Sequence, residues 1–257
     1  MNRINQLFAT DPKNLLSVYF CAGHPKLEGT AEVIRTLEKN GTNMIEIGIP
    51  FSDPMADGIV IQNASTKALR NGMSLNLLFE QLQNIRRGVN IPLLLMGYLN
   101  PVMQFGFERF CRGCSECGID GMIIPDLPFK EYREHYQSIA EQYNLYMIML
   151  ITPETSEERI WEIDRHTNGF IYMVSSAATT GAQQNFDERK QVYFKRIKEM
   201  KLQHPRMVGF GISNRDTFEV ACRYASGAIV GSRFVSLLEE EDDVEKAVKR
   251  LIEGLKG

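Results

Sequence analysis

Short apolar runs alternate with longer amphipathic stretches along the whole chain. The runs consist mostly of β-branched and other apolar residues and are too short for typical helices. Most of them are continuous rather than strictly alternating, as in parallel strands that are covered on both faces. The pattern predicts strands at 16–20, 43–49, 91–98, 121–126, 145–151, 169–175, 206–212 and 227–232.

Between these runs, apolar residues recur with the spacing of amphipathic helices. Several stretches close with a glycine just past the last apolar position, which is typical of a helix C-terminus. A short helix is also expected directly after the last strand. The longer helices are predicted at 31–41, 75–88, 105–118, 130–143, 157–166, 188–200, 216–227 and 242–257.

Eight strand–helix units in 257 residues fit a closed (β/α)8 TIM barrel of the α/β class. An open doubly wound sheet is the alternative, because counting units does not show closure. No Pro/Ser-rich linker or low-complexity tract divides the chain, so we expect one barrel domain over residues 1–257. In either architecture, chemistry belongs at the carboxyl ends of the strands.

Charge and hydropathy exclude several classes of protein. A net charge of −3 argues against a general nucleic-acid binder, which needs a basic face to neutralise phosphates. No apolar run reaches the roughly 18 residues needed to span a bilayer. The first 14 residues lack the apolar core of a signal peptide. We therefore expect a cytoplasmic protein with neither nucleic-acid nor membrane partners.

Three of the five cysteines, Cys111, Cys114 and Cys117, follow a C-x2-C-x2-C spacing. This spacing begins like an iron–sulfur motif, but no fourth ligand follows in the ferredoxin pattern. On a helix that ends at Gly118, the three thiols share one side, where a thiol packs as a small hydrophobe. The sequence favours packing over metal binding.

Glu46 interrupts the apolar run 43–49. In a strand, its neighbours Ile45 and Ile47 face one side and Glu46 faces the other. If the isoleucines pack under the helices, Glu46 points into the barrel. Burial would raise its pKa and make it an acid–base group near neutrality. A structural glutamate bound to a backbone donor remains an equal alternative.

A second carboxylate, Asp57, follows in a loop shaped by two prolines and a glycine. Such a loop, leaving the carboxyl end of a strand, can return Asp57 over the barrel mouth. Two carboxylates in different surroundings are the pattern that separates an acid from a base. Asp53 in the same loop precedes a proline and is predicted to form a turn.

Small residues occupy the ends of the last three predicted strands, where backbone N–H groups can approach an anion closely. A phosphate held by the loops after strands seven and eight, against a short helix, is a recurrent barrel arrangement. The run 209–214 could instead begin a dinucleotide fingerprint. Its third position is Asn214 and it lacks an early βαβ context, so we favour phosphate.

The remaining candidates are weaker. The four histidines are scattered without ligand spacing, and most are expected at surface or loop positions. Tyr19, Tyr98 and Tyr172 fall on predicted strands and could line a pocket, although strand aromatics are more often core residues.

With these features together, the chain resembles the tryptophan synthase α-subunit family from end to end. The most specific segment is EIGIPFSDPMADGIVIQ, and the glycine-rich ends TTG, GFGIS and AIVGS add support. The resemblance implies a (β/α)8 barrel that cleaves indole-3-glycerol phosphate to indole and glyceraldehyde 3-phosphate. It implies no metal or organic cofactor. It also implies a β-subunit partner, in an α2β2 tetramer, that receives the indole.

The resemblance assigns roles to eight residues. Glu46 and Asp57 match the family's two catalytic carboxylates. Tyr172 matches a tyrosine beside the glutamate, and Tyr19 an aromatic of the indole pocket. The family's phosphate contacts match Gly181, Gly211, Gly231 and Ser232.

The chain departs from the family at several positions near these residues. Ile59 stands where proline is usual, and Cys21 and His24 replace a commoner Thr and Asp. Residues 175–178, Ser-Ser-Ala-Ala, also differ. Two alternative functions remain: another phosphate-binding barrel, such as a phosphosugar isomerase, or a non-catalytic partner that activates another subunit. Retention of both carboxylates argues against the second.

Overall fold

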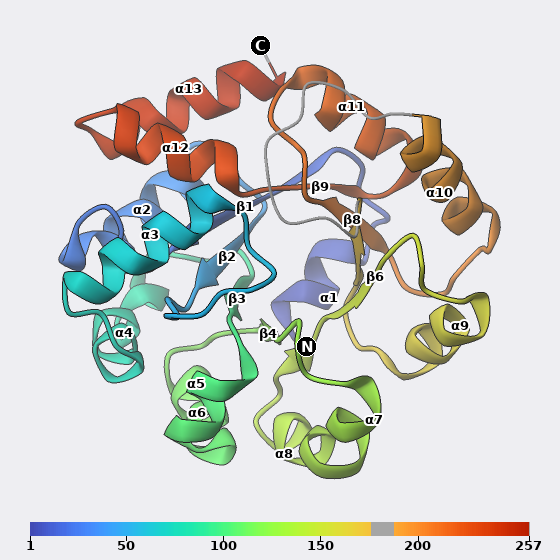
Figure 1. Cartoon of the computed structure of the whole chain (residues 1–257), viewed down its shortest axis with the longest axis horizontal. Coiled ribbons are helices and arrows are strands. Elements are labelled where there is room, and N and C mark those ends of the chain that lie inside the picture. The colour runs from blue at the N-terminus through green and yellow to red at the C-terminus, as the bar shows by residue number, and fades with distance from the viewer. Residues whose placement is uncertain (176–187, 257) are drawn as a thin grey trace.

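In the described part of the chain, nine parallel strands form a single sheet that comes round on itself (Figure 1). The computed structural model describes residues 1–175 and 188–256. The strands at the two ends of the order β5-β4-β3-β2-β1-β9-β8-β7-β6 are separated in sequence only by Ile148. The predicted strand 145–151 is therefore one strand with a one-residue interruption, and the predicted barrel is confirmed over the open sheet. The strands are β1 (Leu15–Cys21), β2 (Met44–Gly48), β3 (Leu93–Met96), β4 (Gly121–Ile123), β5 (Tyr146–Met147), β6 (Met149–Ile151), β7 (Ile171–Val174), β8 (Arg206–Gly209) and β9 (Gly227–Val230).

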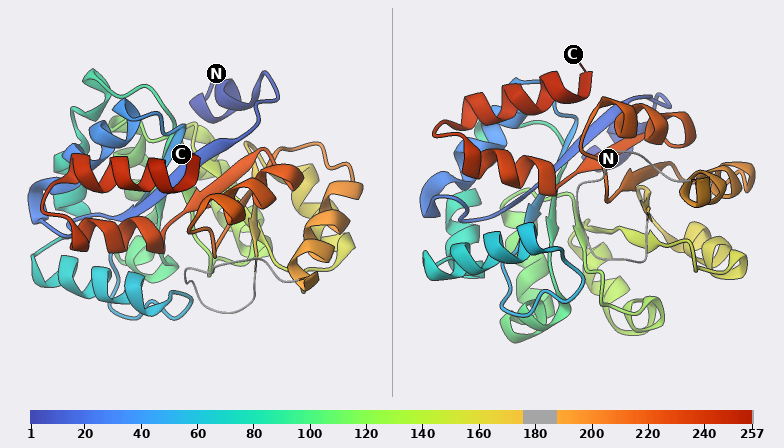
Figure 2. Two further views of the ribbon diagram at one scale, coloured as in Figure 1. Left: turned by 90° about the horizontal axis from the view of Figure 1, so that it is seen from above. Right: turned by 45° about the horizontal axis from the view of Figure 1, so that its top comes forward.

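Helices surround the sheet on its outer side (Figure 2). Each predicted helix has a counterpart, although the stretch 130–143 divides into short α and π segments. The helices are α1 (Arg3–Phe8), α2 (Thr30–Lys39), α3 (Ile59–Arg70), α4 (Leu75–Leu82), α5 (Leu99–Phe105), α6 (Phe107–Glu116), α7 (Phe129–Glu131), α8 (Gln137–Gln142), α9 (Glu157–His166), α10 (Glu188–Glu199), α11 (Arg215–Tyr224), α12 (Ser232–Glu240) and α13 (Val244–Lys256).

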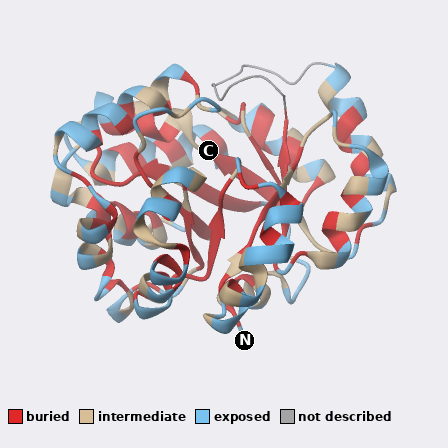
Figure 3. Ribbon diagram, turned by 60° about the horizontal axis from the view of Figure 1, so that its bottom comes forward, coloured by how far each residue is buried: buried red, intermediate tan, exposed pale blue. Residues whose placement is uncertain are grey.

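Alternate residues of each strand serve two separate cores. Outward-facing residues such as Ile45 and Ile47 join the large cluster between sheet and helices. Inward-facing residues such as Leu15 and Met44 join a smaller cluster that fills the barrel. Figure 3 shows the result, with buried strands inside a shell of helices whose outer faces are exposed. Because the period of a strand is two, Glu46 must share the interior with Met44.

Helix α1 lies across the amino-terminal end of the barrel. Its Ile4 is fully buried in the interior cluster, and Leu7 and Phe8 pack against it. Asn2 caps the helix and donates to the backbone oxygen of Asp120 at 2.8 Å. The Asp120 carboxylate also accepts from Arg3 at 3.0 Å, so α1 is held by polar and apolar contacts.

Helices α1, α3 and α5 are not predicted by the sequence pattern. Helix α3 contains β-branched residues and Asn, which have modest helix propensity, yet it buries Ile61, Ala64 and Ala68. Helix α5 carries Pro101 in its first turn, where no intrahelical N–H bond is lost. Tertiary burial therefore decides helix formation at sites where local propensity is weak.

The three closely spaced cysteines pack as predicted. Cys111 and Cys114 on α6 are fully buried, and Cys117 ends the helix at 3% exposure. All three belong to the outer core cluster. None of the helices in the described part of the chain has the length and apolarity to span a membrane.

Candidate active site

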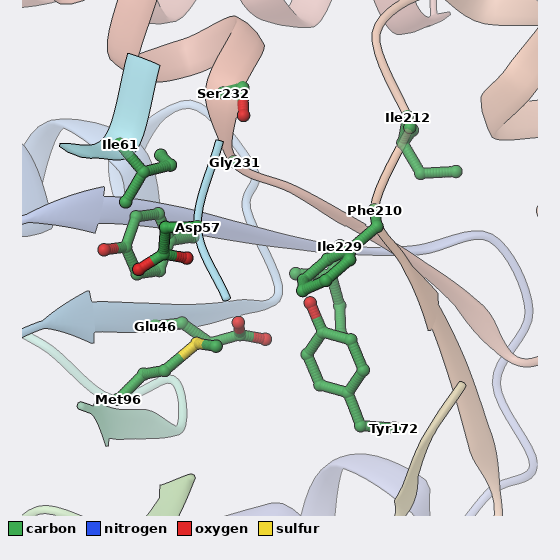
Figure 4. A pocket seen from close by; sticks show the side chains of 12 residues that line it. Glu46, Asp57, Ile61, Met96, Tyr172, Phe210, Ile212, Ile229, Gly231 and Ser232 are labelled. Atoms are coloured by element: carbon green, nitrogen blue, oxygen red, sulfur yellow. The ribbon is translucent and has the colours of Figure 1, made fainter. Parts of the chain in front are cut away.

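One pocket opens at the carboxyl ends of the strands and brings together seven of the eight predicted site residues. They come from β1, β2, β7 and the segments after β2, β8 and β9 (Figure 4). Gly181, the eighth, lies outside the described residues. The seven are Tyr19, Glu46, Asp57, Tyr172, Gly211, Gly231 and Ser232.

Glu46 points from the middle of β2 into this pocket and is completely buried. Ser17 of β1 donates a hydrogen bond to its Oε1 at 3.0 Å. Its Oε2 has no hydrogen-bond partner among residues 1–175 and 188–256. Burial raises the pKa of Glu46 from 4.5 to about 8, against the opposing effect of the Ser17 hydroxyl. Glu46 is therefore mainly protonated at neutral pH.

Asp57 reaches the same pocket from the loop between β2 and α3. Its Oδ2 accepts a hydrogen bond from the Tyr98 hydroxyl at 3.0 Å. The same hydroxyl oxygen accepts from the Ala56 backbone N–H at 3.0 Å, so Tyr98 fixes both the loop and the carboxylate. Burial raises the pKa of Asp57 to about 6, and the Tyr98 hydrogen bond opposes this rise. Asp57 is mainly ionised at neutral pH, unlike Glu46.

Two glycines make room for the two pocket tyrosines. A Cβ at Gly48 would lie 2.2 Å from the Tyr19 hydroxyl oxygen, and one at Gly209 would lie equally close to that of Tyr172. Each ring thus lies directly over the backbone of a strand. Phe210 meets Tyr172 edge-on, with ring centroids 6.1 Å apart. In Figure 4 the Tyr172 hydroxyl and the Glu46 carboxylate point into the same space.

The remaining wall has the features of an anion site. Gly211 has φ +78°, a conformation that side chains other than glycine rarely adopt. Gly231 precedes α12, and Ser232 is the first residue of that helix. The amino end of a helix carries unpaired N–H groups and a partial positive charge. These features support the predicted phosphate position after β8 and β9.

Several residues in or beside the pocket have no sequence signal of their role. Ser17, which binds Glu46 from outside the pocket lining, is one small residue within an apolar run. Met96 and Phe210 line the pocket but read as ordinary strand residues. The sequence predicts Tyr98 only as a strand aromatic that could line a pocket, whereas the residue precedes α5 and binds Asp57. Its partner lies 41 residues away in sequence, so no local pattern could reveal the pair.

His24 occupies a loop, as expected for most of the histidines, but it is not at the surface. It lies in the loop after β1 but is only 2% exposed, and burial lowers its pKa. Its Nε2 contacts Glu239 of α12. Glu239 also accepts from Lys67 of α3 at 2.8 Å, so this carboxylate connects α12 with α3 outside the pocket.

The chain is similar to tryptophan synthase alpha chains along nearly its entire length. The family model described as "Tryptophan synthase alpha chain" matches residues 6–256. The alpha chain of Bacteroides fragilis is 74% identical over 251 residues, covering 98% of this chain and 95% of that protein. That of Bacteroides thetaiotaomicron is 71% identical over 256 residues, covering both chains completely.

Solved structures agree with the sequence comparison. The crystal structure of tryptophan synthase subunit alpha from Legionella pneumophila matches with a TM-score of 0.88 and 33% identity, over 99% of this chain and 97% of that one. A chain of tryptophan synthase from M. tuberculosis, in its aminoacrylate-bound form, matches with a TM-score of 0.85 and 26% identity, covering 99% and 98%. The chain belongs to the tryptophan synthase alpha chain family, whose reaction is the cleavage of indole-3-glycerol phosphate to indole and glyceraldehyde 3-phosphate.

Proposed function

We propose that the pocket performs this cleavage as a retro-aldol reaction, with Glu46 as the acid–base group and Asp57 as the charge-stabilising group. The observation that carries the proposal is the contrast between two carboxylates in one pocket. The pKa of Glu46 is near 8 and that of Asp57 is near 6. Around pH 7 the first therefore holds a proton and the second a negative charge, as the two roles require.

The chemistry explains why both groups are needed. The carbon–carbon bond breaks toward the indole ring, so ring carbon C3 must first become tetrahedral by accepting a proton. Glu46 supplies this proton, and positive charge develops on the ring nitrogen. The carboxylate of Asp57 accepts the N–H hydrogen bond and stabilises that charge. As the bond breaks, the Glu46 carboxylate takes the proton of the glycerol hydroxyl, so the carbonyl forms and the acid is restored.

The other predicted residues position the substrate. Tyr19 and Tyr172 offer ring faces to the indole within the pocket. Gly211, Gly231 and Ser232 would hold the phosphate against the start of α12. The family resemblance adds Gly181 as a phosphate contact. Anchoring the phosphate contributes orientation rather than chemistry.

We also propose that the chain works with a tryptophan synthase β subunit in an α2β2 tetramer. Likeness to a chain of the M. tuberculosis synthase supports a partner of this kind. Near the pocket, Met55 and Ile59 are 87% and 68% exposed, and such apolar side chains suit a protein interface. A single domain spanning 1–257 and a cytoplasmic location stay predictions.

Release of indole from indole-3-glycerol phosphate tests the proposal, with the purified chain alone and with a β subunit. The chain should release indole, and Glu46→Gln should lose at least about 100-fold in turnover with the fold intact. Glu199→Gln on the outer helix α10, whose side chain is 67% exposed, is the matched control and should keep full activity. Near-normal turnover by Glu46→Gln would refute the role of Glu46.

A further inference from the structure

Ser17 stands out among the residues that point into the barrel. It lies on β1 between Leu15 and Tyr19, and it is completely buried. Its strand neighbours in register are Met44 of β2 and Ile229 of β9, which both belong to the apolar interior cluster. Burying a hydroxyl among such side chains is costly unless it forms a hydrogen bond. The partner of Ser17 is Oε1 of Glu46, at 3.0 Å.

The two oxygens of Glu46 are therefore not equivalent. Oε1 accepts the Ser17 hydroxyl proton, whereas Oε2 is buried without a partner in the described parts of the chain. A carboxyl oxygen that accepts a hydrogen bond in this direction is a poor site for the acid's own proton, because the carbonyl oxygen of a neutral carboxyl group is a much better acceptor than its hydroxyl oxygen. The proton of neutral Glu46 is thus favoured on Oε2.

We propose that Ser17 is a positioning residue for the cleavage, whose hydroxyl holds Oε1 of Glu46 so that Oε2 carries the transferred proton toward the substrate. This inference rests on the acid–base role proposed for Glu46. Ser17 touches neither substrate nor reacting atoms and acts only through the carboxyl group. Ser17 consequently orients the carboxyl group of Glu46 and also fills space in the barrel interior.

Other ionisable groups around Glu46 do not replace this contact. Asp57 from the loop after β2, Tyr19 from β1 and Tyr172 from β7 line the same pocket. Among described residues, Ser17 is the hydrogen-bond donor recorded for this carboxyl group, and no Lys, Arg or His lines the described pocket. The Ser17 hydroxyl therefore opposes the effect of burial, because a donor stabilises the ionised carboxylate.

The test compares the pH dependence of kcat/KM for indole cleavage in the parent chain and in three variants. Ser17→Ala removes the hydroxyl, Ser17→Cys keeps the size with only a weak donor, and Ser17→Thr keeps the hydroxyl. For Ala and Cys we expect the alkaline limb to move up by about one pH unit, with about a tenfold fall in kcat. The acidic limb, set by Asp57, should not move, and Thr should restore the parent profile.

A second readout does not depend on turnover. Infrared difference spectra, with Glu46→Gln as the reference, report the C=O stretch of protonated Glu46 during a pH titration. The titration midpoint should rise in Ser17→Ala and Ser17→Cys. Ser226→Ala is the control, because Ser226 is a buried serine at the amino end of β9, away from the pocket. It should change neither the midpoint nor the pH profile.

The two readouts separate this inference from the proposed function. If Ser17→Ala and Ser17→Cys lower kcat but leave the alkaline limb and the infrared midpoint in place, Ser17 only packs and the inference is wrong. If Ser17→Ala does not fold, Ser17→Cys is compared with Ser17→Thr, again by the alkaline limb of the pH profile and by the infrared midpoint. Full activity of Glu46→Gln would overturn the proposed function instead, while a raised infrared midpoint would still confirm the contact.

Discussion

Replacing Glu46 with Gln should stabilise the protein in a pH-dependent way while it removes the acid–base group. The folded chain holds a proton on Glu46 up to about pH 8, whereas the unfolded chain releases it near pH 4.5. Between these values the native state binds more protons than the unfolded state, so its stability falls as pH rises. Gln has nearly the same shape but does not titrate, so the variant does not lose this stability as pH rises.

The size of the effect follows from the same two pKa values. At about 1.4 kcal/mol per pH unit, keeping the proton at pH 7 costs the folded parent about 3 kcal/mol. The penalty is absent below pH 4.5 and complete above pH 8. The Gln amide adds a constant difference, so the informative quantity is how the stability gap between variant and parent changes with pH. We expect the gap to widen by about 3 kcal/mol between pH 4.5 and 7.

Urea unfolding of parent and variant at several pH values between 4.5 and 8.5, followed by circular dichroism, measures this gap. Indole release from the same samples shows the loss of function alongside the gain in stability. Glu199→Gln, at an exposed site, should give a gap that does not change with pH. A constant gap for Glu46→Gln would mean that Glu46 is not held protonated, and the assignment of the acid would fail.

Three further predictions concern other parts of the site. Asp57→Asn should lower turnover by about 100-fold with a smaller change in substrate binding, since the charge that Asp57 opposes grows only toward the transition state; steady-state kinetics would contradict this if only KM changed. Gly211→Asp should abolish binding of indole-3-glycerol phosphate in calorimetry but spare an indole analogue, because φ is +78° and the new charge repels phosphate. Equal losses for both ligands would indicate collapse of the pocket mouth. Ile59→Pro should raise the free energy of unfolding by about 0.5–1 kcal/mol. Ile59 is the first residue of α3, where proline is favoured, and the ψ of 166° at Gly58 suits a following proline. A lower melting temperature in scanning calorimetry would show that this loop needs a different conformation.

Local hydrophobic periodicity predicts most of the barrel strands and the inward position of one of the two candidate catalytic carboxylates, Glu46. Eight apolar runs became the barrel strands, and alternation at Ile45, Glu46 and Ile47 correctly placed the glutamate inside. These signals work because a strand that is covered on both faces leaves a continuous apolar pattern. The interruption at Ile148 has no such signature, because Ile148 is itself apolar and buried and continues the apolar run.

Contacts between side chains of neighbouring strand–helix units could not be predicted from sequence patterns. The contact of Ser17 with Glu46 spans 29 residues, and that of Tyr98 with Asp57 spans 41. Both depend on the pairing and register of neighbouring strands, β1 with β2 and β2 with β3, which no local stretch specifies. His24 illustrates the same limit, because its partner, Glu239 of α12, lies 215 residues away.

Barrel closure also sets an order of events during protein synthesis. Strand β1 pairs with β2 on one side but with β9 on the other, and Ile4 of α1 packs in a cluster with Phe170 and Met207. The ribosome releases α1 and β1 long before it makes those partners. Until β9 emerges, the nascent chain carries an open strand edge and an uncovered apolar helix face, the features that chaperones recognise and that promote aggregation. The segment of α1 and β1 is therefore made before these partners and is buried only after they appear.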